Sequence, residues 1–259
     1  MPGIQGVDLA TDASDVVAEL RGSGLDFVAR YYRDPTSRWP ALTAAEAQRL
    51  SALGLKIVAV WEFHSGKPWY FSFASGYWEG VAAWREAAAI GQPTGSAIYF
   101  AVDFNANGAD LYQVDQYFRG VNAAFANISR GRPGYRIGVY GSGAVCDAVT
   151  RARLAQYSWL SNARAWAGYG SYAGWNIRQH GPFGTLSFNH DSDEARGDYG
   201  AFALAGYAPP ERLPPQPTPT PVAAIVPPQP IPTPVAATRP EPEPVQSDMT
   251  LDTLIRSLF

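Results

Sequence analysis

Short apolar runs alternate with longer segments of helical pattern between Ile4 and His190, and this alternation restricts the fold more than any other feature. Eight runs are rich in β-branched or aromatic residues, and they cover Ile4–Leu9, Phe27–Tyr32, Lys56–Glu62, Ala97–Phe104, Arg136–Tyr140, Tyr157–Leu160, Trp175–Gln179 and Thr185–His190. Four segments between the early runs are long enough for helices, namely Ser14–Arg21, Ala44–Leu53, Tyr77–Ile90 and Leu111–Ile128. Strands that alternate with helices pair in parallel, so we expect an α/β fold, a TIM-type (β/α) barrel.

The connections between the last three runs are too short for full helices, so the second half of this barrel is expected to be irregular. Helix starts are indicated by Thr43 and Glu46, which form a capping-box pattern, and by Asp110, a predicted N-cap. Gly54 and Gly91 are expected to end the helices that precede them. No G-x-G-x-x-G motif follows the first run, which argues against a dinucleotide-binding fold.

Prolines divide the 259-residue chain, because fifteen of its 22 prolines lie between Pro209 and Pro244. We predict a folded barrel over residues 1–207 and a disordered, proline-rich linker over 208–246, since alternating prolines favour an extended chain with little to pack. Residues 247–259 are predicted to form a short amphipathic helix, whose apolar stripe consists of Leu251, Leu254, Ile255 and Leu258. This helix is expected to dock on a protein partner or on a second copy of the chain.

Composition excludes several classes of function. The net charge is −3 and the pI about 5.6, so no basic field is present to bind nucleic acid. The single cysteine, Cys146, cannot form an intrachain disulfide or a thiolate metal cluster. No stretch approaches the ~20 apolar residues of a membrane span, and the N-terminus lacks the basic and apolar regions of a Sec signal. The sequence does not predict the localisation. Association with a virion and delivery to the cell envelope are the two possibilities considered.

Acidic residues end or follow several of the predicted strands, where a barrel places its chemistry. Asp8 ends the first strand, Glu62 the third and Asp103 the fourth, and Asp191 follows the eighth. Glycoside hydrolysis needs one protonated and one ionised carboxyl group, and like charges in one cleft separate their pKa values. We therefore predict that Asp8, Glu62 and Asp103 are catalytic residues in one concave mouth. The alternatives are loop caps for the aspartates and a salt bridge from Glu62 to Arg30.

Other polar and aromatic residues near the strand ends are expected to bind substrate. They are Arg30, Tyr31, Trp61, Asn105, Tyr140, Gln179 and Asp191. Aromatic rings suit a carbohydrate cleft because they stack on sugar faces while keeping a polar edge. Three histidines, His64, His180 and His190, also follow strands, but none has a metal-binding spacing. No metal and no cofactor are predicted.

Four short motifs stand in a fixed order, at Gly6–Asp8, Ile98–Asp103, Ile137–Gly141 and Trp175–Gln179. With these motifs the chain resembles the bacterial and phage glycoside-hydrolase-like family of unknown function, a distant relative of the family 25 lysozymes, over about Gly3 to Gly206. The resemblance implies a barrel whose relatives cleave or bind the glycan strands of the bacterial cell wall. It also implies a site centred on a first-strand aspartate, which Asp8 matches, and a fourth-strand acidic pair.

The fourth strand departs from the lysozyme pattern. Where the lysozymes carry Asp-x-Glu, this chain reads Ala-Val-Asp-Phe-Asn over residues 101–105. Either Asp103 replaces the glutamate and Ala101 the aspartate, or Asp103 is the aspartate and Asn105 replaces the acid. One carboxylate is missing in both registers, and an amide cannot donate a catalytic proton.

The leading hypothesis is a hydrolase of cell-wall peptidoglycan or a related glycan. In it Asp103 is the electrostatic or basic group, Glu62 is the acid, and Asp8 positions or tunes them. The second hypothesis is a catalytically inactive glycan-binding or structural module with the same barrel, for example in a virion. A third, a metal-dependent hydrolase, would use the histidines.

Overall fold

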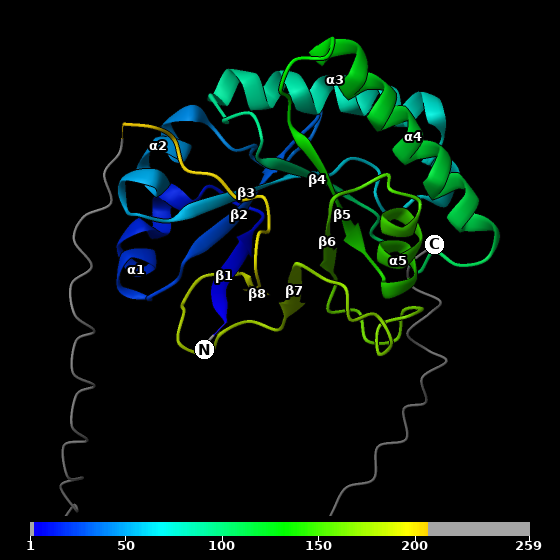
Figure 1. The fold of residues 1–259 in the computed structure, drawn as a ribbon. Helices are drawn as coiled ribbons and strands as arrows, with labels where there is room; N and C mark the ends of the chain where they lie inside the picture. The colour runs from blue at the N-terminus through cyan, green and yellow to red at the C-terminus, as the bar shows by residue number, and fades with distance from the viewer. Residues whose placement is uncertain (1–2, 207–259) are drawn as a thin grey trace, which may run out of the picture. The chain divides into compact units, whose positions relative to one another are not determined.

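Eight strands close into a barrel in the computed structural model, which describes residues 3–206 (Figure 1). The strands are β1 (Ile4–Leu9), β2 (Phe27–Tyr32), β3 (Lys56–Trp61), β4 (Ala97–Ala101), β5 (Arg136–Gly141), β6 (Tyr157–Leu160), β7 (Ile177–His180) and β8 (Asp191–Ala195). Each strand pairs with its neighbours in sequence, and β1 pairs with β8 to close the barrel. The predicted TIM-type barrel is confirmed. The predicted linker 208–246 and helix 247–259 lie outside the described residues.

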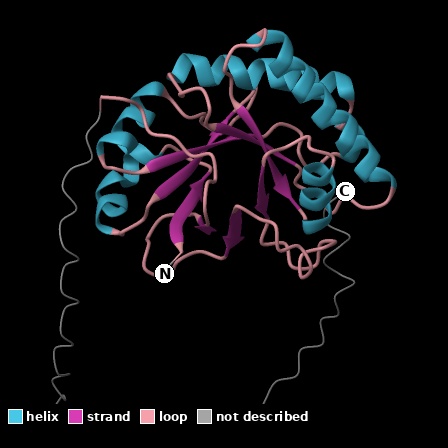
Figure 2. Cartoon of the chain, in the orientation of Figure 1, coloured by secondary structure: helices cyan, strands magenta, loops and turns pink. Residues whose placement is uncertain are grey.

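Helices lie on the outside of the strands (Figure 2). Among the described residues they are α1 (Val17–Gly22), α2 (Ala44–Ala52), α3 (Phe73–Ile90), α4 (Ala109–Ser129) and α5 (Gly143–Arg151), with the 3-10 turns η1 (Ala13–Val16) and η2 (Pro68–Tyr70). From α5 to residue 206 no further helix follows, so the second half is irregular, as the short connections predicted. None of the helices within residues 3–206 combines the length and the apolar character that a bilayer crossing requires.

Several helix boundaries differ from the prediction. Asp110 is not an N-cap, because α4 already begins after Gly108, which has no side chain to cap it. At α2 the Thr43 side chain accepts a hydrogen bond from the Glu46 amide, but the Glu46 carboxylate pairs with Arg30 instead of returning to Thr43. Helix α5 was not predicted from the sequence. It follows β5 directly and begins after Ser142, whose side chain caps it.

The last strand differs from the prediction in both place and direction. We expected it at Thr185–His190, parallel to the others, but β8 begins at Asp191 and runs antiparallel to β7 and β1. Its sequence, Asp-Ser-Asp-Glu-Ala, has no apolar run to mark it as a strand. The reversal places the beginning of β8, instead of its end, beside the carboxyl ends of the parallel strands.

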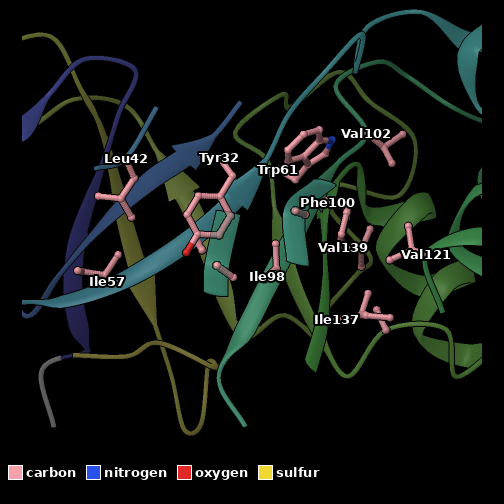
Figure 3. Packing of buried hydrophobic residues seen from close by; sticks show 14 of the residues in the cluster. Tyr32, Leu42, Ile57, Trp61, Ile98, Phe100, Val102, Val121, Ile137 and Val139 are labelled. Carbon is pink, nitrogen blue, oxygen red and sulfur yellow. The ribbon is translucent and has the colours of Figure 1, made fainter. Parts of the chain in front are cut away.

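Alternate residues of the apolar strands, such as β2, β3 and β4, pack into two separate apolar layers, because successive side chains of a strand point to opposite faces. Outward residues of β3, β4 and β5 pack against the helices, and several of them are shown in Figure 3. Inward residues fill the barrel, and they include Phe27, Ala29, Val58, Val60, Tyr99 and Trp159. The parity of a residue within its strand therefore decides whether its side chain can reach the barrel mouth.

Two glycines make room for large rings inside the barrel. A Cβ on Gly6 would lie 2.4 Å from the Phe27 ring, and one on Gly138 would lie 2.5 Å from the Tyr99 ring. Gly138→Ala is expected to lower the free energy of unfolding by about 1–3 kcal/mol, because the packed ring has little space to shift. Urea denaturation measures this, with Gly170→Ala as the control, since its Cβ would meet nothing within 4 Å. Equal stability of the two variants would contradict the packing argument.

Candidate active site

A pocket of about 250 Å³ opens at the mouth formed by the carboxyl ends of the parallel strands. Its lining consists of Asp8, Tyr31, Val60, Glu62, Ala101, Asp103, Tyr140, Trp159, Gln179 and Asp191. The structure thus brings together the three predicted catalytic residues. Four of the predicted substrate-binding residues also line this pocket, namely Tyr31, Tyr140, Gln179 and Asp191.

Three predicted substrate-binding residues do not line this pocket. Arg30 is fully buried on the outer face of β2, where it forms an ion pair with Glu46. Trp61 also points outward from β3, is buried among the residues drawn in Figure 3, and donates its indole hydrogen bond to Glu79. Both have the wrong parity, since the residue that follows or precedes a pocket residue in a strand faces the helices. Asn105 instead holds a loop, because its side-chain oxygen accepts the amide of Ala167.

Asp8 lies at the centre of a hydrogen-bond network on the pocket wall. Tyr31 Oη donates to Asp8 Oδ1 at 3.1 Å, and Gln179 Nε2 donates to Asp8 Oδ2 at 2.8 Å. Gln179 Nε2 also lies 3.4 Å from Asp191 Oδ2, and its Oε1 accepts from Tyr140 Oη at 3.0 Å. The network thus joins Asp8 on β1 to residues of four other strands, β2, β5, β7 and β8.

A further carboxyl group, that of Asp193, lies below this network. It was not among the site residues predicted from the sequence. Asp193 is fully buried and faces the barrel interior from β8, two residues after Asp191. Burial raises its pKa well above the usual range, and the charge of Asp8 adds to the rise, while the Trp159 indole opposes it. The alternation of acidic residues at 191 and 193 was the signal for a shared inward face.

Glu62 and Asp103 lie on the other side of the pocket and differ in how they are held. Glu62 Oε2 accepts a hydrogen bond from Arg33 Nη1 at 3.1 Å, and Glu62 Oε1 accepts one from Ser65 Oγ at 2.9 Å. The predicted salt bridge from Glu62 to Arg30 is wrong, because Arg33 is the partner. The Asp103 side chain makes no hydrogen bond within residues 3–206, whereas its backbone amide donates to Ser65. Asp103 thus presents an unoccupied carboxyl group at the mouth.

The pocket raises the pKa values of its aspartates. Burial raises the pKa of Asp8 to about 7, although the hydrogen bond from Gln179 lowers it. The negative charges of Asp191 and Glu62 contribute to the rise. Burial also raises the pKa of Asp103, with the charge of Glu62 as the second cause. Such a cluster keeps at least one carboxyl group protonated near neutral pH, as acid–base chemistry requires.

The three histidines do not converge on this pocket. His190 accepts the Phe183 amide at 2.9 Å, and His180 lies 3.7 Å from a Glu194 oxygen. His64 lies in the loop after β3. Over the part of the chain that the structure describes, no three side chains of metal-binding type are placed to hold an ion.

Comparisons with known proteins agree with this fold and place the chain in a family. The model of the Rv2525c-like, glycoside hydrolase-like domain matches residues 18–196. The chain is 31% identical over 153 residues to the uncharacterized protein FadG of Bacillus subtilis, which covers 57% of this chain and 26% of FadG. It is 26% identical over 160 residues to Rv2525c of Mycobacterium tuberculosis, whose name proposes a peptidoglycan hydrolase; the match covers 59% of this chain and 64% of Rv2525c.

A crystal structure of the Tat-secreted protein Rv2525c superposes with a TM-score of 0.64 at 23% identity, over 77% of this chain and 98% of that one. A Bacillus stearothermophilus protein gives a TM-score of 0.56 at 18% identity, over 75% and 96%. These structures share the fold. Because the family model matches more than half of the residues of this chain, the chain belongs to the Rv2525c-like, glycoside hydrolase-like domain family.

Proposed function

We propose that this domain hydrolyses glycosidic bonds in the glycan strands of bacterial cell-wall peptidoglycan. The observation that carries the proposal is the pocket in which Asp8, Glu62, Asp103 and Asp191 converge at the barrel mouth. Paired carboxyl groups are the minimum for acid-assisted cleavage of a glycosidic bond. Membership of a glycoside hydrolase-like family and the similarity to Rv2525c support the choice of substrate.

In this proposal Asp8 donates a proton to the leaving oxygen. Its pKa of about 7 keeps much of it protonated at neutral pH, and the Tyr31 hydroxyl beside it can donate or accept. A proton on Glu62 would break its ion pair with Arg33. The role of the acid, which the sequence predicted for Glu62, is therefore assigned to Asp8. Asp103, with no hydrogen bond to its carboxyl group within residues 3–206, stabilises the developing positive charge or accepts the proton of the attacking water.

The second candidate is a glycan-binding module without catalysis, and Ala101 is the observation that favours it. Ala101 lines the pocket on the same face of β4 as Asp103, so the position that an Asp-x-Glu pair would fill with aspartate is apolar. Asn105, the alternative site of the lost acid, lies outside the pocket lining. Binding without cleavage would fit a pocket that lacks this carboxylate.

Incubating the full chain with purified peptidoglycan distinguishes the two candidates. Hydrolysis is expected to release soluble fragments with new reducing ends, counted against a boiled-protein control. Co-sedimentation with peptidoglycan that yields no new reducing ends would contradict the hydrolase proposal and support the binding module.

A further inference from the structure

A second, larger hollow of about 530 Å³ lies beside the acidic pocket and shares Tyr31 and Glu62 with it. We call it the basic groove, and its lining is Ala10, Tyr31, Arg33, Ser37, Arg38, Trp39, Glu62, Phe63, His64, Ser65, Gly66 and Lys67. Most of its walls come from the loops that follow β2 and β3, with Ala10 after β1 and Tyr31 within β2 completing the lining. The two hollows therefore adjoin at Tyr31 and Glu62.

The groove carries the opposite charge to the pocket, from Arg33, Arg38 and Lys67. Arg33 is only 8% exposed and stacks over the Tyr31 ring at 4.2 Å. Its Nη1 bonds to Glu62, but its buried Nε has no hydrogen-bond partner among residues 3–206. An unpaired buried donor is costly, so the guanidinium is suited to an acceptor that arrives with a ligand.

Glu62 belongs to the groove lining, and Asp34 and Glu86 lie near it; all three carboxylates accept hydrogen bonds. Glu62 is bonded to Arg33 and Ser65, and the Asp34 carboxylate accepts from the Thr36 amide at 2.9 Å. Arg38 and Lys67 are exposed, and within the described residues neither forms an ion pair. The groove lining carries three cationic side chains, Arg33, Arg38 and Lys67, against one carboxylate, Glu62, so its net charge is positive.

Aromatic rings form the apolar part of the groove. Trp39 is 45% exposed, and the Phe63 and His64 rings lie 4.1 Å apart. His64 has φ +50°, a left-handed conformation that is rare outside glycine, and the loop around it is fixed through Ser65 to Glu62 and to Asp103. The loop that lines the groove therefore also contacts Glu62 and Asp103 of the acidic pocket.

We propose that the basic groove binds a carboxylate on a substituent of the sugar whose ring occupies the acidic pocket, which rests on the hydrolase or binding function proposed above. In peptidoglycan such a carboxylate is carried by the lactyl ether of muramic acid or by the peptide attached to it. Arg38 and Lys67 bind it from the exposed side, and Arg33 lies on the buried side. The acidic pocket itself repels this charge, so the two hollows fix the orientation of the glycan.

Titration of the full chain by NMR tests this with three probes. N-acetylglucosamine is neutral, N-acetylmuramic acid adds a lactyl carboxylate, and muramyl dipeptide carries its carboxylate on the peptide. We expect the better carboxylated probe to bind about tenfold more tightly than the neutral sugar. Arg38→Ala with Lys67→Ala should remove this preference and leave the affinity for N-acetylglucosamine unchanged. Arg132→Ala, an exposed cation outside the groove, should change neither.

The outcomes separate the groove from the pocket. Tighter binding of N-acetylmuramic acid than of muramyl dipeptide assigns the groove to the lactyl carboxylate, and the reverse order assigns it to the peptide. Equal affinity for all three probes, or a preference that survives the double substitution, overturns the groove and leaves the proposed function standing. Failure of every probe to bind, together with no release of peptidoglycan fragments, overturns both.

Discussion

Asp103→Asn is expected to lower the rate of glycan cleavage by about 10²–10⁴-fold, the usual contribution of a positioned acid–base group. The substitution keeps the size of the side chain and removes only its ability to ionise. Because the Asp103 carboxyl group makes no hydrogen bond within residues 3–206, its loss should change the free energy of unfolding by less than about 0.5 kcal/mol. Rates of reducing-end release and urea denaturation on the same preparations measure the two effects.

Asp147→Asn is the matched control for this prediction. It is the same chemical change on α5, where Asp147 is half exposed and pairs with Arg151 outside the pocket. Its cleavage rate should equal that of the parent chain. An Asp103→Asn protein as active as the Asp147→Asn protein would remove Asp103 from the mechanism and favour the binding module.

Asp8→Asn is expected to change how the free energy of unfolding depends on pH. The difference between its values at pH 8 and pH 4 should be more favourable for Asp8→Asn than for the parent. The pKa of Asp8 is raised from 3.8 to about 7 in the folded state, so the folded chain keeps a proton that the unfolded chain releases. The contribution of Asp8 to the stability of the parent therefore falls as the pH rises from about 4 to about 7. Three pKa units correspond to at most about 4 kcal/mol, and asparagine cannot incur this cost.

Urea denaturation at several pH values measures this difference, and the pH dependence isolates it from any constant loss of hydrogen bonds. Cleavage by the parent chain should also decline above about pH 7, as Asp8 loses the proton it donates. Asp147→Asn should follow the parent's stability profile. Parallel profiles for Asp8→Asn and the parent would show that Asp8 titrates normally and is not the proton donor.

The sequence predicted much of the barrel because most of its strands are apolar. β1, β2 and β6 begin and end where the pattern placed them, and the strand-end acids Asp8, Glu62 and Asp103 do share one pocket. Strand β8 could not be found in this way, since two of its three inward positions are filled by Asp191 and Asp193 and only the last, Ala195, is apolar. The bonds that β8 makes with two neighbours, and not its own sequence, determine its conformation.

Two predicted substrate-binding residues lie outside the pocket for one physical reason. Arg30 and Trp61 were predicted to bind substrate because they lie near strand ends, but neighbours along a strand face opposite sides of a sheet, and Tyr31 and Glu62 are the ones that line the pocket. The role of Glu62 depended on Arg33, which lies beyond the end of β2 and whose contact with β3 no local pattern records. Trp159 joined the pocket because the barrel closes, a long-range consequence of eight paired strands.

Digestion of peptidoglycan in ¹⁸O-labelled water, followed by mass spectrometry of the fragments, tests the central claim most directly. If the pocket formed by Asp8 and Asp103 hydrolyses a glycosidic bond, the label enters the new reducing-end sugar, and Asp103→Asn abolishes its incorporation. Label in a peptide carboxylate with the glycan intact, or sugar labelling that is unchanged in Asp103→Asn, would contradict it.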